Sequence, residues 1–396
     1  MKEKMAVILA GFCVLAGLAA AALIWTPLLG ADAGLGLTNL NNSFVFGLWI
    51  IADLSLIAFG SAAFATALIH FIFRRRYLRG LVPLSVAVGL LCYGCAGFIL
   101  LLEIGQPLRF WFPFRHPNFV SMLTEITFCI TLYSLVLILE FTPVALGHRR
   151  LRRSALACSV KQRLLLALPV LAAIGVFLSL LHQGSLGGVY GVLFARPFAW
   201  RPGLGIWPWT CLLFIVSAMA AGPLFMALIA GIVARAGKVH ILSGLILDDL
   251  GRFAAWLLGL NLALRGLDLL LWRFWLLPEQ GISFDQMFHG LAFGKWLLAA
   301  ELALGSLFPL LILTRLKWRT KPPWFFAAAA LACLGLVLNR YIMNLQTLAV
   351  PTLPFDNWKS YHPNLVEIAP VLMALGLFVL VLRFLFKQGL LFERDK

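Results

Sequence analysis

Residues 81–102 read LVPLSVAVGLLCYGCAGFILLL, an apolar stretch that contains no charged side chain. An α-helix rises about 1.5 Å per residue, so a stretch of this length crosses the roughly 30 Å hydrocarbon core of a lipid bilayer. Because a helix satisfies its backbone hydrogen bonds internally, this segment predicts a transmembrane helix.

Nine further apolar runs lie along the chain, so the sequence predicts about ten transmembrane helices. They cover about 5–25, 44–73, 119–144, 164–184, 207–234, 244–272, 290–314, 324–346 and 367–386. The connections between these runs are too short to fold alone. We therefore expect residues 1–396 to form a single polytopic membrane domain, an all-α integral membrane protein.

The composition excludes a soluble enzyme. Hydrophobic residues make up 62% of the chain and charged residues 12%, against about 45–50% and about 25% in soluble domains. A formal net charge of +16 would by itself suggest a nucleic-acid-binding protein. The Lys and Arg residues lie in short connections between apolar runs, however, so we expect membrane lipid and no nucleic acid as a partner.

Lys and Arg residues gather in alternate connections, and this predicts the orientation of the chain. The basic connections lie at 2–4, 74–79, 149–163, 235–238, 315–321 and 383–396. The connections of the other side hold fewer cations, namely Arg109, Arg115, Arg196, Arg201, Arg273 and Lys359. By the positive-inside rule, both termini are expected in the cytoplasm, and the long connections rich in Gly, Pro and aromatic residues are expected on the outer side.

The sequence predicts no redox centre and no metal site in this chain. Cys92 and Cys95 form the only C-x-x-C pair, whereas an iron–sulfur cluster or a zinc site needs four suitable ligands. Only His70 and His182 fall within predicted spans, and they lie at opposite faces, whereas a b-haem needs two histidines at matched depth. We therefore expect no haem, no iron–sulfur cluster and no metal.

Ionisable residues inside the predicted spans are the candidate functional residues, because each costs about 2.5–3.5 kcal/mol at the bilayer centre on insertion scales. Those in the outer half are Glu125, His182, Arg265, Asp268, Lys295 and Arg340. Asp53 and Glu301 lie somewhat deeper, and Asp249 lies near the cytoplasmic side, where it can pair with Arg252. The common depth of the outer group predicts a polar pocket that opens near the outer surface.

For several of these residues, an ordinary structural role is the alternative to a functional one. Arg265 and Asp268 lie three positions apart on one helix and can simply neutralise each other. A single histidine such as His182 is often a packed, hydrogen-bonded residue. Glu103 and Glu140 lie at span ends and are expected to be ordinary interfacial residues.

The stretch LHQGSLGG at 181–188 resembles the H-Q-x-S-x-G signature of the NrfD/PsrC family, the membrane subunits of polysulfide-reductase-like complexes. Further matches follow in the same order as in the family, and together they cover about 40–370. They are FGLWI with Asp53 (46–53), EIGQP (103–107), NFVSMLTE (118–125), LEFTP (139–143), RGLD (265–268), Glu301 with FPL (308–310), and Asn339 with Arg340. Gln106 stands where the family usually has Arg. The chain is most similar to the ten-span, HybB-like branch.

This resemblance implies two four-helix bundles, spans two to five (about 44–184) and spans six to nine (about 207–346), with flanking outer helices. Small-residue stretches at 60–63 and 217–222 suit close helix packing. The resemblance also implies a bacterial inner-membrane location and a quinone bound near the periplasmic face. The partners implied are a periplasmic, ferredoxin-like iron–sulfur subunit and a periplasmic catalytic or cytochrome subunit.

The function that this resemblance predicts is that of a quinone-interacting membrane subunit of a periplasmic-facing respiratory oxidoreductase. The subunit would exchange electrons between the iron–sulfur partner and menaquinone or menaquinol. His182, Glu125 and Asp53 are expected to contact the headgroup or exchange protons with it, and Ser185 and Gly187 of the signature are expected to complete the binding site. A proton path or, alternatively, a paired structural network is expected of Asp249, Asp268, Glu301, Arg265 and Arg340.

The outer connections are expected to dock the iron–sulfur partner, because they combine cations with large aromatic side chains. The residues concerned are Arg109, Arg115, Arg196, Arg201, Trp111, Phe112, Phe114, Trp200 and Trp207. An alternative function is a secondary transporter that uses the buried charges to couple a solute or an ion. Solute flux in liposomes would distinguish the two.

Overall fold

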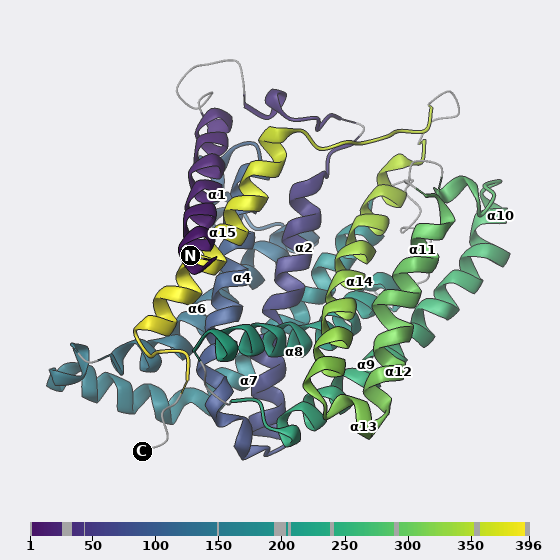
Figure 1. The fold of residues 1–396 in the computed structure, drawn as a ribbon. Coiled ribbons are helices and arrows are strands. Elements are labelled where there is room, and N and C mark those ends of the chain that lie inside the picture. The colour runs from purple at the N-terminus through teal and green to yellow at the C-terminus, as the bar shows by residue number, and fades with distance from the viewer. Residues whose placement is uncertain are drawn as a thin grey trace.

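Long helices that run alongside one another dominate the computed structural model (Figure 1). Among the residues described, ten helices are long and apolar enough to cross a membrane, which confirms the predicted number. The described residues are 2–25, 34–42, 44–148, 150–193, 203–204, 207–237, 241–288, 293–351 and 357–392. The predicted class, an all-α integral membrane protein, is also confirmed.

The spans keep the order of the apolar runs in the sequence, and two of them consist of two α-helical pieces each. The spanning helices are α1 (Lys2–Trp25), α2 with α3 (Leu48–Gly60, Ala62–Ala67), α4 (Val82–Glu103), α6 (Met122–Leu146), α7 (Ala155–Gly191), α8 (Trp209–Gly237), α9 (Gly244–Leu271), α11 with α12 (Lys295–Leu302, Phe308–Thr314), α14 (Pro322–Ala349) and α15 (Leu365–Lys387). Short π-helical segments follow α3, follow α9 and join α11 to α12, at Leu68–Ile72, Trp272–Leu276 and Ala303–Leu307.

In the described parts of the connections, the helices and strands are short. Three are brief α-helices, α5 (Phe112–Arg115), α10 (Leu277–Glu279) and α13 (Leu316–Arg319). Single 3-10 turns lie at Gly34–Leu37, Arg76–Leu81, Pro107–Arg109, Leu151–Arg153 and Gln286–Phe288. The strands β1 (Gly203–Leu204) and β2 (Trp207–Pro208) form one antiparallel pair, in which Gly203 faces Pro208 and Leu204 faces Trp207. None of these elements forms a separate soluble layer.

Helix α7 differs most from its predicted boundaries, because it covers 37 residues where the apolar run suggested 164–184. At about 1.5 Å per residue it is roughly 55 Å long, well beyond the bilayer core. The Ser154 hydroxyl caps its first turn by accepting a hydrogen bond from the Ala157 N–H. The apolar run marked only the part suited to lipid, whereas Lys161 and Arg163 continue the helix because both are good helix formers.

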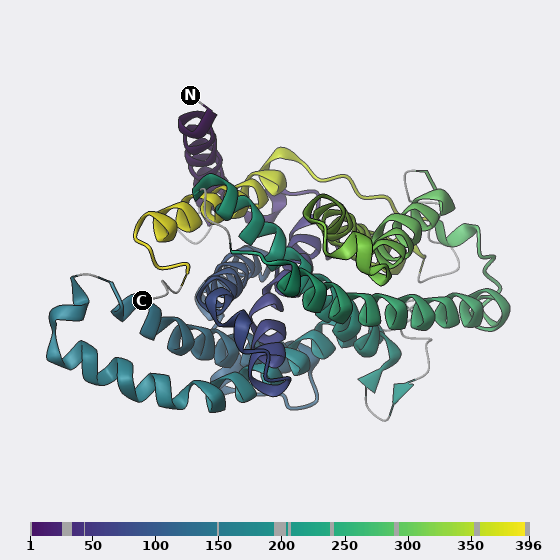
Figure 2. The same ribbon diagram turned by 60° about the horizontal axis from the view of Figure 1, so that its bottom comes forward.

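Helix packing joins the two predicted groups of spans through α8. The helices α2, α3, α4, α6 and α7 pack against one another, and α8, α9, α12 and α14 do the same. Helix α8 also packs against α2, α3 and α7, and one apolar core contains buried residues from both groups. Helices α1 and α15 pair with each other and lie to one side (Figure 2). The division into two four-helix bundles stays a prediction.

Small residues allow two close helix crossings. A Cβ atom at Gly222 of α8 would lie 1.9 Å from the Ser61 Oγ between α2 and α3, and that hydroxyl donates a hydrogen bond to the Ala218 carbonyl at 2.7 Å. A Cβ atom at Gly335 of α14 would lie 1.9 Å from the Gly305 Cα in the π-helical segment. Larger side chains would separate these helices, as expected for packing driven by close contact within lipid.

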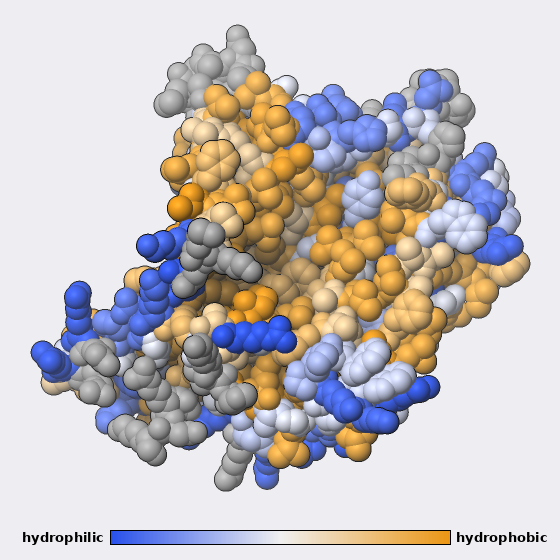
Figure 3. Space-filling model, viewed as in Figure 1, coloured by the Kyte–Doolittle hydropathy of each residue, from blue (hydrophilic) through white to orange (hydrophobic). Residues whose placement is uncertain are grey.

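The outer surface of the helices carries the apolar belt expected of a membrane protein. In the view of Figure 3, hydrophobic side chains cover the middle of the molecule, and hydrophilic ones lie above and below. Phe12, Leu166 and Trp256 are 69%, 83% and 83% exposed. A continuous apolar surface of this extent needs lipid or another protein as its cover.

Candidate functional site

The first buried polar group, named here the α2–α7 cluster, consists of Asp53, Tyr93 and His182 on α2, α4 and α7. All three residues are buried, with exposures of 2%, 1% and 1%. The Tyr93 ring lies beside the imidazole of His182, with ring centroids 5.6 Å apart, and its hydroxyl lies within electrostatic range of Asp53. Two residues that the sequence marked as candidates are thus held beside one tyrosine.

A side-chain hydrogen bond positions His182 on this cluster. The adjacent Gln183 donates from Nε2 to the Ile57 carbonyl of α2 at 2.9 Å, and Ile57 lies one helical turn from Asp53. This contact ties α7 to α2 and directs the neighbouring imidazole into the helix bundle. It is a contact between residues distant in sequence, so a motif search could not identify the acceptor.

The α2–α7 cluster has hydrogen-bonding capacity that the protein itself leaves unused. Within the described part of the chain, neither ring nitrogen of His182 has a hydrogen-bond partner, and the same holds for the Asp53 Oδ1 atom. An unmet buried polar group costs about 1–3 kcal/mol, and such groups are uncommon in folded proteins. These atoms are chemically suited to bind a polar ligand.

Two further hydroxyl residues extend the cluster. The rings of Tyr93 and Tyr133 meet edge to face, with centroids 4.6 Å apart, and both hydroxyls lie near the Ser179 side chain. Ser179 precedes His182 by one helical turn on α7. These neutral residues carry no intramembrane charge, so the search for costly ionisable groups missed them.

Glu103 corrects one expectation. The sequence suggested an ordinary interfacial residue, but both carboxylate oxygens are buried, without a hydrogen-bond partner among the residues described. Glu103 also lies within electrostatic range of Asp53 and of Glu367 at the start of α15. Its place in the E-I-G-Q-P turn was the available signal, and helix packing rather than sequence position decides its burial.

Glu367 and Tyr361 tie the end of the molecule near the cluster to α15. The Tyr361 hydroxyl donates to Glu367 and accepts a hydrogen bond from the Leu48 N–H at 2.8 Å. The Trp49 indole donates to the Glu367 carbonyl at 2.8 Å. Burial and then the hydrogen bond with Glu367 raise the pKa of Tyr361, so the phenol stays protonated and keeps its role as donor.

Glu125 lies on the first turn of α6 and is half-buried. Its carboxylate is within electrostatic range of Cys129 and of Cys211 on α8. Among the hydrogen bonds of the described residues, none joins Glu125 to His182. The structure therefore places Glu125 beside α8, and its participation in the same site as His182 stays a prediction.

Ser185 and Gly187 have clear packing roles. The Ser185 hydroxyl donates to the Leu181 carbonyl at 2.9 Å within α7. A Cβ atom at Gly187 would lie 2.5 Å from the Thr210 carbonyl oxygen, and the Thr210 hydroxyl donates to the Gly187 carbonyl at 2.7 Å. The signature thus allows α7 to approach α8 closely, and direct ligand contact by these two residues stays a prediction.

The second buried polar group, named here the α9–α14 cluster, consists of Arg265, Glu301, Arg340 and Ser217. Arg265 on α9 donates from Nη1 to the Glu301 Oε1 on α11 at 2.9 Å, and both side chains are buried. The sequence left open a pairing of Arg265 with Asp268 on its own helix. The structure shows that Arg265 pairs with a carboxylate 36 positions away.

Arg340 on α14 lies within electrostatic range of Arg265 and Glu301. It donates to the Asn339 Oδ1 and to the Ser217 hydroxyl of α8, both at 2.9 Å. Its guanidinium also lies 3.6 Å above the centroid of the Phe214 ring. A buried cation held by hydrogen bonds and an aromatic face is strongly positioned.

Neutral side chains connect α7 to α14 beside the two clusters. The Tyr190 hydroxyl of α7 donates to the Asn344 Oδ1 of α14, and the Asn344 amide donates to the Phe46 carbonyl, both at 2.9 Å. Asn344 lies one helical turn from Arg340. Sequence analysis did not identify Tyr190 or Asn344, because neither carries a charge.

Asp249 lies apart from both clusters, and the prediction that it pairs with Arg252 was wrong. It pairs with Arg75 at 3.3 Å, whereas Arg252 pairs with Asp248 at 2.8 Å. The spacing of four along the helix suits the second pair better than a spacing of three. Asp249 is about 24 Å along α9 from Arg265, so it anchors the basic end of the molecule.

The chain is similar to known membrane subunits along most of its length. The family model "Polysulphide reductase, NrfD" matches residues 36–351. The integral membrane subunit of a menaquinone reductase from Nitratidesulfovibrio vulgaris is 43% identical over 91% of this chain and 87% of its own length. A selenate reductase subunit from Mesobacillus selenatarsenatis is 21% identical over 92% and 90%. A probable Ni/Fe-hydrogenase 2 b-type cytochrome subunit from Escherichia coli is 31% identical over 39% of each chain.

Proposed function

Because this chain belongs to the polysulphide reductase NrfD family, we propose that it is the quinone-interacting membrane subunit of a respiratory oxidoreductase and that its quinone is menaquinone. The similarity to a menaquinone reductase subunit along most of both chains supports the choice of quinone. The positive-inside pattern supports an inner-membrane protein with both termini in the cytoplasm.

One observation carries the proposal, namely the unused hydrogen-bonding groups of the α2–α7 cluster. A quinone headgroup has two carbonyl oxygens, and each needs a donor and a proton when the ring is reduced by two electrons and two protons. The His182 imidazole supplies a donor to one carbonyl, and Asp53 exchanges a proton near it. Tyr93, beside the imidazole, holds its orientation. Glu125, on the first turn of α6, exchanges protons beside this site.

Electrons reach the quinone from a partner, because the sequence predicts no redox centre in this chain. The outer connection between α4 and α6 offers the docking surface, since Arg109, Arg115 and five exposed aromatic residues lie there. Its expected partner is a periplasmic iron–sulfur subunit, together with a catalytic or cytochrome subunit. Arg196, Arg201 and Trp200, which the sequence also suggested, lie outside the described residues, as does the side chain of Trp207.

The α9–α14 cluster is the proposed route for protons, in keeping with the sequence prediction for Arg265, Asp268, Glu301 and Arg340. Arg340 links to α8 through Ser217, and Arg265 links α9 to α11 through Glu301. The hydrogen bond between the Tyr190 hydroxyl and Asn344 links this side of α14 to α7. Asp249 is the weakest member, because it lies about 24 Å from Arg265 and pairs with Arg75 at the basic end.

The test is equilibrium binding of a fluorescent hydroxyquinoline N-oxide, a menaquinone analogue, to the purified full chain in nanodiscs. We expect His182→Ala to weaken binding about ten-fold, which corresponds to the loss of one hydrogen bond from a buried site. His148→Ala is the matched control, because His148 follows the opposite end of α6, where it contacts Gln388 at 2.9 Å. Equal affinity of the unaltered protein, His182→Ala and His148→Ala would contradict the proposed site.

A further inference from the structure

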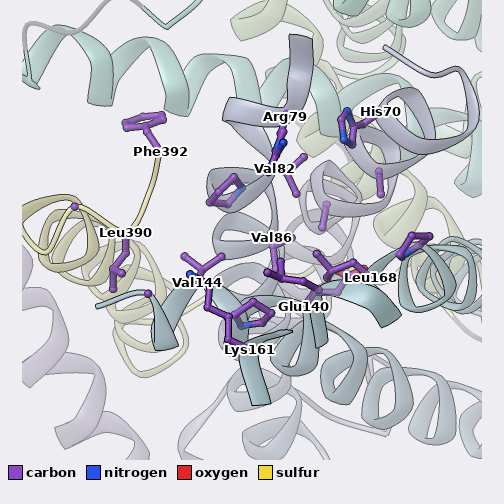
Figure 4. Close-up of a pocket in the computed structure, with 18 residues that line it drawn as sticks. His70, Arg79, Val82, Val86, Glu140, Val144, Lys161, Leu168, Leu390 and Phe392 are labelled. Carbon is purple, nitrogen blue, oxygen red and sulfur yellow. The ribbon is translucent and has the colours of Figure 1, made fainter. Parts of the chain in front are cut away.

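A cavity of about 870 Å³ lies at the basic end of the molecule. Its lining residue Glu140 approaches the α2–α7 cluster, because Glu140 Oε1 and Tyr133 Cε2 lie 3.9 Å and 3.4 Å from the point where a Cβ atom of Gly175 would be. It is bounded by α3, α4, α6, α7 and the segment that follows α15. Figure 4 shows its side chains, with Leu390 and Phe392 across the space from His70. The proposed quinone chemistry uses none of these residues.

Charged side chains in the cavity are arranged by depth. The Lys161 Nζ lies 3.4 Å from where a Cβ atom of Gly147 would be, at the final turn of α6. The Glu140 Oε1 lies 3.9 Å from the corresponding point at Gly175, and Glu140 is about two turns deeper in α6 than Gly147. The Lys161 ammonium group therefore lies near the end of α6, which we call the mouth of the cavity. The Glu140 carboxyl group lies further inside the helix bundle.

Arg79 supplies a second cation on the other wall. It belongs to the 3-10 turn that precedes α4, and in Figure 4 it lies across the cavity from Lys161, with Val82 and Val86 between them. The remaining walls are largely apolar and include Leu165 and Leu168 of α7. The lining suits a ligand with an anionic head and an apolar body.

We propose that this cavity binds an acidic glycerophospholipid of the leaflet at the basic end of the protein. Its phosphate lies between Arg79 and Lys161, and its glycerol and upper acyl chains follow Val82, Val86 and Leu168. Two cations and one carboxyl group line the cavity, so the cationic side chains outnumber the acidic one. This excess of positive charge complements the negative charge of a phosphodiester. The size suits a headgroup with the first part of its chains.

The surroundings of the mouth support a lipid rather than a soluble ligand. The first half of α7 extends past the helices it packs on, and Leu156 and Leu166 are 74% and 83% exposed. The same stretch carries Arg163 and follows Arg153, and its hydrophilic side chains project at the lower left of Figure 3. Cations beside exposed apolar side chains are typical of a helix at an anionic membrane surface.

The experiment is native mass spectrometry of the purified full chain titrated with phosphatidylglycerol, with phosphatidylcholine and with inorganic phosphate. We expect one phosphatidylglycerol to bind more tightly than phosphatidylcholine, and inorganic phosphate not to compete. Lys161→Gln should weaken phosphatidylglycerol binding about five-fold, as expected for one cation near an anionic headgroup. Arg163→Gln is the matched control, because Arg163 lies two positions further on the same helix but does not line the cavity.

Three results would overturn this proposal. Equal binding of the two lipids would remove the role of charge, and equal losses in the two variants would assign the effect to the basic surface of α7. Competition by inorganic phosphate would identify a free anion site instead of a lipid site. If Lys161→Gln does not fold, Leu168→Trp provides a second test, because an indole that fills the apolar part of the cavity should also reduce binding.

Discussion

The two buried polar clusters of this protein differ in how their charged groups are balanced. In the α9–α14 cluster, Arg265 pairs with Glu301, and Arg340 has three partners within the protein. In the α2–α7 cluster, both nitrogens of His182 and one oxygen of Asp53 have no hydrogen-bond partner in the described part of the chain. In the α9–α14 cluster, the Glu301 Oε2 and Arg340 Nε atoms also lack a hydrogen-bond partner among the described residues. The clusters therefore differ in whether a side chain has any partner at all, since Glu301 and Arg340 each have at least one, whereas the His182 imidazole has no hydrogen-bond partner there.

The largest effect is expected where the α9–α14 cluster is broken. Arg265→Leu should lower the free energy of unfolding by about 3–5 kcal/mol, because it leaves the Glu301 charge buried without its partner. The double variant Arg265→Leu with Glu301→Leu should recover most of that loss. Detergent-denaturation curves of the full chain measure both values.

Lys295→Gln is the control for this cycle, because Lys295 forms an exposed ion pair with Asp285 at 3.0 Å in the same region. It should change the free energy of unfolding by about 1 kcal/mol or less. A small loss for Arg265→Leu as well would show that the two clusters do not differ in the way described.

The next largest effect concerns turnover in the α2–α7 cluster. His182→Ala should reduce menaquinone turnover by the assembled complex about 100-fold, the lower range for loss of a proton-transfer group. Its unfolding free energy should fall less than that of Arg265→Leu, because no described hydrogen bond is lost. Gln183→Ala removes the 2.9 Å contact with Ile57, so it should lower the unfolding free energy more than His182→Ala does and reduce turnover less. Normal turnover in His182→Ala would exclude the imidazole from the reaction.

Glu125 tests how far the α2–α7 cluster extends. Glu125→Gln keeps the side-chain shape and removes the exchangeable carboxyl proton, so turnover should fall about ten-fold if this group takes part in proton exchange. The assay is the pre-steady-state rate of quinone reduction with co-purified partner subunits. An unchanged rate would limit the site to α2, α4 and α7.

The smallest effect is expected for Asp249→Asn. Its partner Arg75 has a side chain that is 54% exposed, and exposed ion pairs contribute about 0–1 kcal/mol. Turnover and proton uptake into proteoliposomes should both stay at the level of the unaltered protein. A loss of proton uptake with stability unchanged would return Asp249 to the proton path.

The sequence identified ionisable residues that prove to be buried, but not their partners. It singled out Asp53, His182, Arg265, Glu301 and Arg340, because a charge or an imidazole in an apolar span is visible without a structure. It missed the neutral residues that position them, such as Tyr93, Asn344 and Ser217. Tyrosine, asparagine and serine occur in many spans, so only their contacts show which of them matter.

The sequence by itself determined the ten spans, their order and the candidate ionisable residues, because the transfer of a helix into lipid depends on local length and composition. Only the tertiary structure decided that Arg265 pairs with Glu301, that Gln183 ties α7 to Ile57, and that the Glu103 carboxylate is buried. Such partners lie far apart along the chain, so helix packing decides which of them meet. In this protein, it decides which of the costly groups are paired internally.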